Sequence, residues 1–373
     1  MTKPRLSRLA AIRRAALCAS LLSPLTLGSA LAGQPKEPLL ARAVPSNLAL
    51  PIERGSWILP APGEESEPLW GIKGGLAVSL WPVSGGPRGL LRLYSPYLGQ
   101  PRGRLINFIA IEPIVGDHRG LSELEPSKLD HAPGKAMWTS NDREDDPRPR
   151  PPWKPASGKI RKAEGTEQLT FFLFVERFDN GARPVVQVTL RQDRPHEVSL
   201  RVFAARGSAP MKVCVLTATM GNYARLRKLW LRDEVVHSTV LWKEPRLNSW
   251  GFTSPQQWGM DRLKREGDEI MVAATPDEAD PAKAAYAPEV ARSWHYEGRP
   301  GTQYWQAVKQ KGLVVRVNGR LHYWRSKAPI PGGIAYENFE LEAPFRPGQE
   351  FRFGVSPRPP EELGFRAGKK RKE

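Results

Sequence analysis

Cysteine is almost absent from this 373-residue sequence, and its histidines are few and unpaired. The two cysteines are Cys18, in an N-terminal leader, and Cys214, so no internal disulfide can hold the folded chain together. The run VCVLTAT around Cys214 predicts a small buried side chain on a strand. The six histidines lack the i, i+4 spacing of a helical zinc site. We therefore predict no cofactor, except that a structural calcium stays open at Asp277, Glu278 and Asp280.

Long apolar runs are missing after the first 32 residues, which argues against a membrane-spanning helix there. Residues 1–32 have a basic head, a mostly apolar stretch at 15–27 and small residues up to Ala32, a pattern typical of a secretory signal. Pro24 and two serines interrupt that stretch, so a membrane anchor is the poorer interpretation. We predict cleavage after Ala32, no transmembrane segment in the remaining chain, and an exported protein of the periplasm or the extracellular space.

Changes in composition divide the rest of the chain. Residues 33–68 are rich in proline, alanine and glutamate and predict a leader, residues 69–358 predict a single large domain, and residues 359–373 predict a basic, disordered tail. The net charge of +17 indicates an acidic partner. Zinc-finger spacing, a recognition-helix pattern and an RNP motif are all missing. We therefore predict no sequence-specific nucleic-acid binding and favour an anionic glycan or envelope polymer.

Helical periodicity is rare, whereas short runs of β-branched and aromatic residues recur between Pro, Gly, Asn and Asp. These runs predict strands at 90–94, 105–111, 169–176, 185–191, 198–204, 212–219, 235–242, 269–274, 313–317, 321–324, 334–342 and 350–355. Without regular helices between the strands a parallel sheet is unsupported. We predict an all-β fold with few short helices, built as one large antiparallel β-sandwich of the supersandwich type.

Three short segments predict local structure. Asn318-Gly319 lies between apolar runs and predicts a two-residue hairpin turn. Residues 178–184, FDNGARP, predict a second connection between antiparallel strands. Residues 222–231, NYARLRKLWL, fit either a helix or an alternating strand, and both interpretations stay open.

Several enzyme classes lack their signatures, because the sequence has no G-x-S-x-G motif, P-loop or dinucleotide fingerprint. Glycoside chemistry needs two carboxylates across a sugar, and Glu112, Glu337 and Glu340 are candidates on or near predicted strands. Strand alternation places Glu340 on the same face as Asn338, and Glu337 on the same face as Phe339. The commoner role of such carboxylates is a solvent-facing or ion-paired one.

β-Elimination from a uronate needs a cation on the substrate carboxylate and a Tyr or His that moves the C5 proton. Residues 219–227 and 293–305 supply these groups, and arginine suits a planar carboxylate. The candidate catalytic residues are Tyr223, Arg225, His295 and Tyr304. Aromatic rings beside polar donors are suited to holding sugars, and the candidate substrate-binding residues are Asn222, Trp258, Trp294, Tyr296, Arg299 and Trp305. The alternative is that these rings only close the open ends of the sandwich.

The chain resembles a family of uncharacterised exported bacterial β-sandwich proteins in four segments: GLLRLYSPYLGQPRGRLINFIAIEPIV (89–115), RGLSELEPSKLD (119–130), TATMGNYARLRKLWL (217–231) and YENFELEAPFRPGQEFRFGV (336–355). The closing ENFELEAPFRPGQEFRFGV is also similar to the end of galactose-mutarotase-like supersandwich proteins. The second resemblance implies a fold shared by epimerases and polysaccharide lyases. The paired histidines and glutamate of that family are not found here as a set.

Together these features predict an exported carbohydrate-active protein that acts on or binds an anionic polysaccharide. If the protein is an enzyme, we expect a uronate lyase that works by β-elimination. The alternative is a non-catalytic protein that binds a glycan or the cell envelope.

Overall fold

Strands dominate the fold, as the density of β-branched and aromatic residues predicts. The computed structural model describes residues 57–60, 68–83, 86–100, 105–145, 154–219, 223, 225–290, 292, 295–323 and 326–368, without the side chains of 81–83 and 282. All of them belong to one of the chain's two compact units, Leu39–Glu373. The predicted signal and most of the predicted leader lie outside the described residues.

The described strands form two antiparallel sheets. The first has ten strands, in the spatial order β1 (Trp57–Ile58), β2 (Leu69–Ile72), β3 (Ala77–Val83), β4 (Gly86–Tyr94), β5 (Leu105–Val115), β12 (Val213–Thr219), β20 (Ala335–Glu342), β19 (Val314–Arg320) and β15 (Gln256–Gly259), with β6 (His118–Arg119) beside β5. The second has eleven, in the order β14 (Val235–His237), β13 (Leu226–Trp230), β17 (Glu269–Pro276), β18 (Thr302–Val308), β21 (Gln349–Ser356), β11 (Arg194–Ala204), β10 (Pro184–Arg191), β9 (Thr166–Val175) and β7 (Met137–Ser140). In this sheet β16 (Lys264–Glu266) also pairs with β17, and β8 (Lys159–Ala163) with β9.

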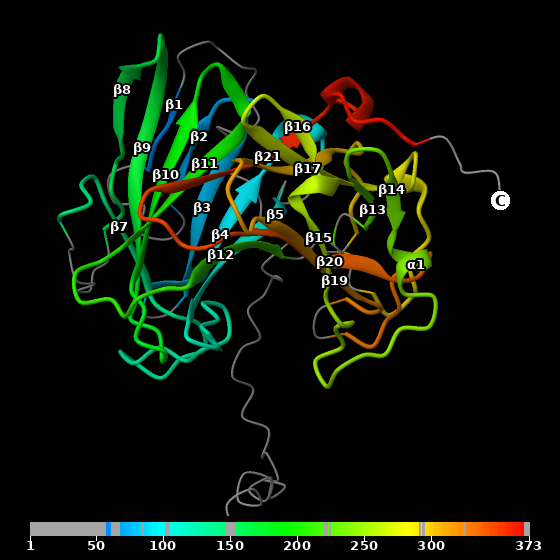
Figure 1. The fold of residues 1–373 in the computed structure, drawn as a ribbon, viewed down its shortest axis with the longest axis horizontal. Helices are drawn as coiled ribbons and strands as arrows, with labels where there is room; N and C mark the ends of the chain where they lie inside the picture. The colour runs from blue at the N-terminus through cyan, green and yellow to red at the C-terminus, as the bar shows by residue number, and fades with distance from the viewer. Residues whose placement is uncertain are drawn as a thin grey trace, which may run out of the picture. The chain divides into compact units, whose positions relative to one another are not determined.

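The two sheets pack against each other around one main hydrophobic core (Figure 1). Leu216 and Leu341 reach this core from the first sheet, and Leu200 and Phe353 from the second, each at most 2% exposed. Burying such side chains contributes about 1.5 to 3 kcal/mol each. The arrangement confirms the predicted all-β antiparallel sandwich.

Helices are short in the part of the chain that the structure describes. They are α1 (Ser238–Leu241) and 3₁₀ turns at Pro96–Leu98, Met260–Arg262, Pro281–Lys283 and Pro360–Leu363. Among the described residues, none of these helices has the length and apolar character needed to cross a membrane.

Some local predictions hold and others are wrong. The predicted strand at 235–242 is a strand only to His237, because Ser238–Leu241 form α1, and the described residues of 321–324 belong to no named strand. Residues 178–184 connect β9 to β10, which pair antiparallel, and Cys214 is buried on β12. Asn318-Gly319 is not a turn, because it lies inside β19, which pairs with β20 on both sides of it. Glycine is needed there for close packing, since a Cβ on Gly319 would lie 3.0 Å from the Ala335 carbonyl oxygen.

Three segment predictions change with the structure. The segment open between helix and strand, 222–231, contains strand β13. Trp57 and Ile58, in the predicted leader, already pair with β2. Phe365, in the predicted disordered tail, is 2% exposed and packs with Trp230 and Tyr304. The disordered tail is therefore wrong for residues 359–368, because burial of this aromatic ring holds them on the body.

Candidate functional site

Two of the predicted site residues, Tyr223 and Tyr296, contact each other, but in the interior of the protein. Tyr223 and Tyr296 are each 1% exposed, and their ring centroids lie 5.7 Å apart in edge-to-face packing. The Tyr223 hydroxyl accepts a hydrogen bond from Gln100 Nε2 at 2.6 Å, and the Tyr296 hydroxyl donates to the Arg299 carbonyl oxygen at 2.8 Å. Burial raises the pKa of both phenols. Buried, hydrogen-bonded phenols of raised pKa are poor bases, so this geometry favours a structural role.

Arg225 and His295 lie against one ring, that of Tyr286. The guanidinium carbon of Arg225 is 4.8 Å from the ring centroid, and the His295 imidazole stacks on the same residue at 3.8 Å. Arg225 is fully buried and pairs with Glu278 at 3.0 Å. Burial lowers the pKa of His295. The charge of Arg225 is thus compensated within the protein and not offered to a substrate carboxylate.

The side chains of the remaining predicted residues make other contacts. Tyr304 is 5% exposed and donates to Glu197 Oε1 at 2.7 Å. Trp258 is half-buried on β15 against the core, and the exposed Arg299 donates to a main-chain carbonyl oxygen. Asn222 and Trp294 lie outside the described residues.

Trp305 lies in the core, and this burial does not favour its predicted role as a sugar-binding surface. Its ring is fully buried between the sheets and packs on Phe353 at a centroid distance of 4.9 Å. The indole Nε1 donates to the Phe339 carbonyl oxygen at 2.7 Å, which links β18 of the second sheet to β20 of the first. Side chains alternate along a strand, and Trp305 falls on the core-facing side of β18.

An open cleft of about 560 Å³ lies elsewhere, over four neighbouring strands of the first sheet, β5, β12, β20 and β19. Its size is within the range of small-molecule sites. Its walls are residues 121–126, which follow β6, and residues 248–255, which precede β15. The main polar residues of its floor are Glu112, Arg316, Asn318, Glu337, Asn338 and Glu340. None of the residues predicted for a lyase site or for sugar stacking, within the described ranges, lines this cleft, whereas the glycoside candidates Glu112, Glu337 and Glu340 do.

A β-bulge gathers the carboxylates of β20. Between Phe339 and Tyr336, β20 has two residues opposite a single residue of β19. Strict alternation places Glu337 on the core-facing side with Phe339, and this prediction is wrong. Because of the bulge, Glu337 lines the cleft together with Asn338 and Glu340.

Arg119, on β6, joins Glu112 and Glu340 of the cleft floor to Glu342, which does not line the cleft. Its guanidinium lies 2.5 Å from Glu112 Oε2, 3.0 Å from Glu340 Oε1 and 3.3 Å from Glu342 Oε1. Arg316 on β19 also pairs with Glu342, at 3.2 Å. Glu112 and Glu340 therefore lie side by side on one guanidinium group.

Glu112 and Glu342 bind protons more tightly than isolated carboxylates do. Burial raises the pKa of Glu112 to about 7, against the lowering effect of Arg119 and with support from the Glu340 charge. Burial and the Glu340 charge raise the pKa of Glu342 to about 7 as well. These raised pKa values favour retention of a proton in the network near neutral pH.

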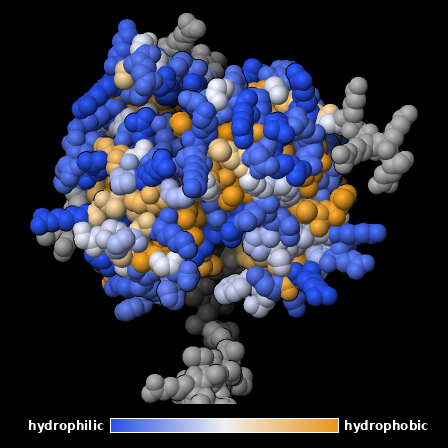
Figure 2. Space-filling view, in the orientation of Figure 1, coloured by the Kyte–Doolittle hydropathy of each residue, from blue (hydrophilic) through white to orange (hydrophobic). Residues whose placement is uncertain are grey.

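An exposed apolar side chain lies on each wall of the cleft. Most of the surface seen in Figure 2 is hydrophilic, whereas Trp250 is 62% exposed on one wall and Leu124 is 39% exposed on the other. Asn248 Oδ1 accepts hydrogen bonds from the Trp250 N–H at 2.9 Å and the Phe252 N–H at 3.0 Å. This side-chain-capped turn holds the indole at the rim. An exposed ring above a polar floor suits a ligand with an apolar face and many hydroxyl groups.

The cleft has the opposite charge to the whole chain. Its described lining carries five carboxylates, Glu112, Glu123, Glu125, Glu337 and Glu340, and two guanidinium groups, Arg119 and Arg316. The whole chain has a net charge of +17. The local excess of carboxylates repels an anionic ligand.

The acidic residues considered for calcium contact cationic side chains instead. Arg227 lies 2.9 Å from Asp277 Oδ1, and Asp280 pairs with Lys283 at 2.9 Å. Glu278 pairs with Arg225, as described above. Within the described ranges, no group of three or more His, Cys, Asp or Glu residues is arranged to hold a metal ion.

Sequence reasoning identifies part of the cleft and misses its centre. Glu112, Glu337 and Glu340 are the carboxylates that the sequence suggests for glycoside chemistry, but Arg119 is missed because a two-residue strand has no recognisable pattern. The available signal is the position of Arg119 just before the acidic run GLSELEP. No protein-family model matches the sequence, and a search of curated proteins finds no match either. The chemistry of the cleft is therefore the basis for inferring a function.

Proposed function

We propose that the cleft binds carbohydrate and that Glu112 and Glu340 transfer protons to and from it. The observation that carries this proposal is the pair of carboxylates on Arg119, in the same cleft as the exposed ring of Trp250. An indole stacks on the apolar face of a sugar ring, while amides and carboxylates bond its hydroxyl groups.

Two carboxyl groups in one cleft, one of them with a raised pKa, are suited to acid–base chemistry at a sugar acetal. Glu112, whose pKa is about 7, donates its proton to the acetal oxygen as the bond from that oxygen to the anomeric carbon breaks. Glu340 accepts a proton from the water molecule that adds to this carbon. The glycosidic bond is then hydrolysed to two sugars, and proton exchange with solvent restores both carboxyl groups.

The cleft favours an uncharged glycan over the anionic polymer expected from the sequence. Its lining carboxylates outnumber its guanidinium groups even though Lys135 pairs with Glu125, and this excess disfavours a uronate. Sugar hydroxyls, in contrast, donate to carboxylates and accept from guanidinium groups. β-Elimination also needs a base beside a substrate-binding cation, and Tyr223 and Arg225 are buried outside the cleft. An anionic substrate and lyase activity stay predictions, which the experiment below also tests.

A non-catalytic glycan-binding role is the second candidate. The side chains of Glu112 and Glu340 are only 11% and 3% exposed. Both pair with Arg119, and such a contact favours the ionised form of a carboxyl group. A protein that only binds sugar needs Trp250 and the polar floor but no proton donor.

The test incubates the purified protein with neutral glucans, xylans and mannans, with an amino-bearing glycan and with uronate polymers. Release of reducing ends reports hydrolysis, ultraviolet absorbance of unsaturated products reports elimination, and calorimetry reports binding. We expect hydrolysis of a neutral glycan, reduced about 100-fold or more by Glu112→Gln and by Glu340→Gln. Glu350→Gln is the control, because Glu350 pairs with Arg201 on the second sheet and is not part of the cleft lining.

Each outcome selects one function. Binding without turnover selects the glycan-binding role, and elimination from a uronate polymer selects the lyase. Binding to no member of the panel overturns the proposal.

A further inference from the structure

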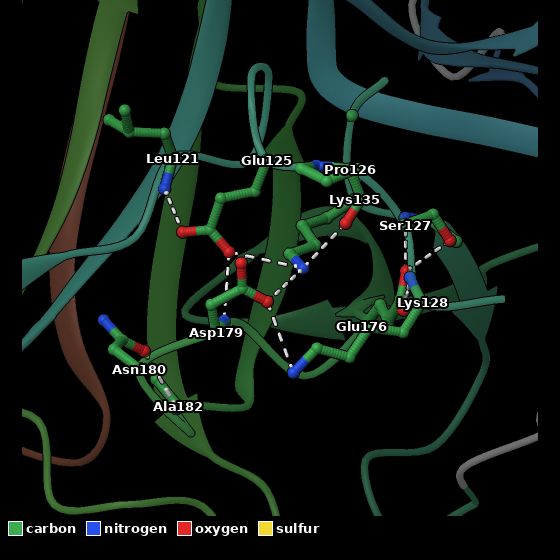
Figure 3. Close-up of polar contacts among 12 residues, drawn as sticks. Leu121, Glu125, Pro126, Ser127, Lys128, Lys135, Glu176, Asp179, Asn180 and Ala182 are labelled. Carbon is green, nitrogen blue, oxygen red and sulfur yellow. Dashed lines mark hydrogen bonds and ion pairs between the residues drawn. The ribbon is translucent and has the colours of Figure 1, made fainter. Parts of the chain in front are cut away.

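The cleft wall at residues 121–126 lies outside the named strands and helices, so other contacts must hold it in place. Irregular backbone keeps a fixed conformation when its polar groups find partners in the protein. Figure 3 shows such partners around Lys135, where charged side chains connect the wall to the segment near Asp179.

Lys135 is at the centre of these contacts. Its side chain is 0% exposed, and its Nζ donates to the Pro126 carbonyl oxygen at 2.9 Å and to Asp179 Oδ1 at 3.2 Å. The same Nζ lies 3.3 Å from Glu125 Oε2. A buried ammonium group is tolerated only when it is paired, so these three oxygens fix its position. Because Glu125 and Pro126 both line the cleft, the ammonium group acts directly on the wall.

Glu125 extends this contact in two directions (Figure 3). Its Oε1 accepts a hydrogen bond from the Leu121 N–H at 3.0 Å, at the start of the wall. Its Oε2 accepts one from the Asp179 N–H at 3.0 Å, in the connection between β9 and β10. The carboxylate thus ties the wall to the second sheet.

Glu176 anchors the chain just beyond the wall. Its carboxylate accepts hydrogen bonds from the Ser127 hydroxyl at 2.7 Å, the Lys128 N–H at 2.5 Å and the Ala136 N–H at 3.2 Å. The side chain of Lys128 also reaches Asp179 at 3.2 Å, but it is 54% exposed. Lys128 and Lys135 therefore both contact the carboxylate of Asp179. Of these two lysines, the buried Lys135 also contacts the cleft wall.

We infer that Lys135 is a positioning residue for the cleft, which holds the wall at 121–126 in the conformation that receives the ligand. This inference rests on the proposed function for the identity of the ligand. A preformed wall reduces the ordering cost of binding. Without the ammonium group, the carboxylates of Glu125 and Asp179 repel each other and the Pro126 carbonyl oxygen loses its donor. The wall then moves while Glu112 and Glu340 keep their contacts with Arg119.

The test compares Lys135→Met with Lys128→Met in the full chain, because methionine keeps most of the apolar stem of either lysine. Amide hydrogen exchange reports the wall, and calorimetry with the neutral glycan that binds wild-type protein reports affinity. We expect Lys135→Met to speed exchange at residues 121–128 by about ten-fold or more and to weaken binding by about ten-fold. Exchange in β5 and β20 should stay unchanged, and Lys128→Met should change neither measurement.

Unchanged exchange at 121–128 in Lys135→Met overturns the inference. Faster exchange with unchanged affinity also overturns it, since the wall would then not position the ligand. If Lys135→Met does not fold, Glu125→Gln replaces it, because this change removes the charge paired with the ammonium group and keeps the side-chain shape. A wild-type protein that binds no glycan counts against the proposed function. In that case, amide hydrogen exchange at residues 121–128 in Lys135→Met decides whether Lys135 holds the wall.

Discussion

Arg119 Nη2 lies 3.0 Å from Glu340 Oε1, although the two residues are 221 positions apart in the sequence. The same guanidinium group contacts Glu112 and Glu342, and Arg316 also contacts Glu342. Three carboxylates thus share two guanidinium groups, so the network carries either an excess negative charge or an added proton. The protonation state of this network, and with it the charge of the cleft floor, therefore depends on pH.

The raised pKa of Glu112 predicts that hydrolysis declines on the alkaline side. A general acid acts only while protonated, and the protonated fraction of Glu112 falls as pH rises through about 7. Well above this pKa, we expect kcat/KM on a neutral glycan to fall about ten-fold per pH unit. The check is the initial rate of reducing-end release across the neutral and alkaline range. A rate that stays level through this range would exclude Glu112 as the acid.

The raised pKa of Glu112 also makes folding stability depend on pH. A carboxyl group whose pKa rises from 4.5 to about 7 on folding keeps a proton that the unfolded chain has already lost. Its contribution to stability is present at low pH and declines as pH rises between these two values. Glu112→Gln cannot ionise, so we expect its free energy of unfolding, relative to wild type, to increase from pH 4.5 to pH 7. Denaturant unfolding of both proteins at the two ends of this window measures the difference, and a constant difference would contradict the shift.

The β-sandwich was predictable from the sequence because the apolar pattern that indicates each strand lies within that strand. In β10, PVVQVTLR, Val186, Val188 and Leu190 alternate toward the core, and β-branched residues fill such positions well. In β12, Cys214 and Leu216 follow the same rule. Each strand therefore carries its own signal, which needs no knowledge of its neighbours.

The candidate site was only partly predictable because it depends on pairing. The bulge that brings Glu337 into the cleft arises between β19 and β20, and nothing in YENFELE alone indicates the extra residue. Arg119 becomes significant only when folding places it against Glu340. In contrast, Trp305 belongs to an aromatic stretch that resembles a binding loop, yet its position on a central strand of the second sheet buries the ring.

Replacing Trp305 tests whether it belongs to the core. Trp305→Phe keeps an aromatic ring but leaves the Phe339 carbonyl oxygen without its indole donor. We expect a loss of about 2 kcal/mol in the free energy of unfolding, with glycan affinity unchanged because the ring does not line the cleft. Chemical denaturation followed by circular dichroism gives the stability, and calorimetry gives the affinity. Lost affinity at unchanged stability would restore Trp305 as the binding surface that the sequence suggested.

Replacing Trp250 tests the rim of the cleft. The ring is 62% exposed, so Trp250→Ala should change the free energy of unfolding by no more than about 0.5 kcal/mol. Loss of a stacking surface should weaken glycan binding by about 1 kcal/mol, which is about five-fold in Kd. Val308→Ala is the matched control, because Val308 is 58% exposed at the end of β18 and outside the cleft lining. Calorimetry on both variants separates the two cases: equal affinities would show that the Trp250 ring does not touch the sugar, whereas a loss confined to Trp250→Ala would place the ligand at this wall.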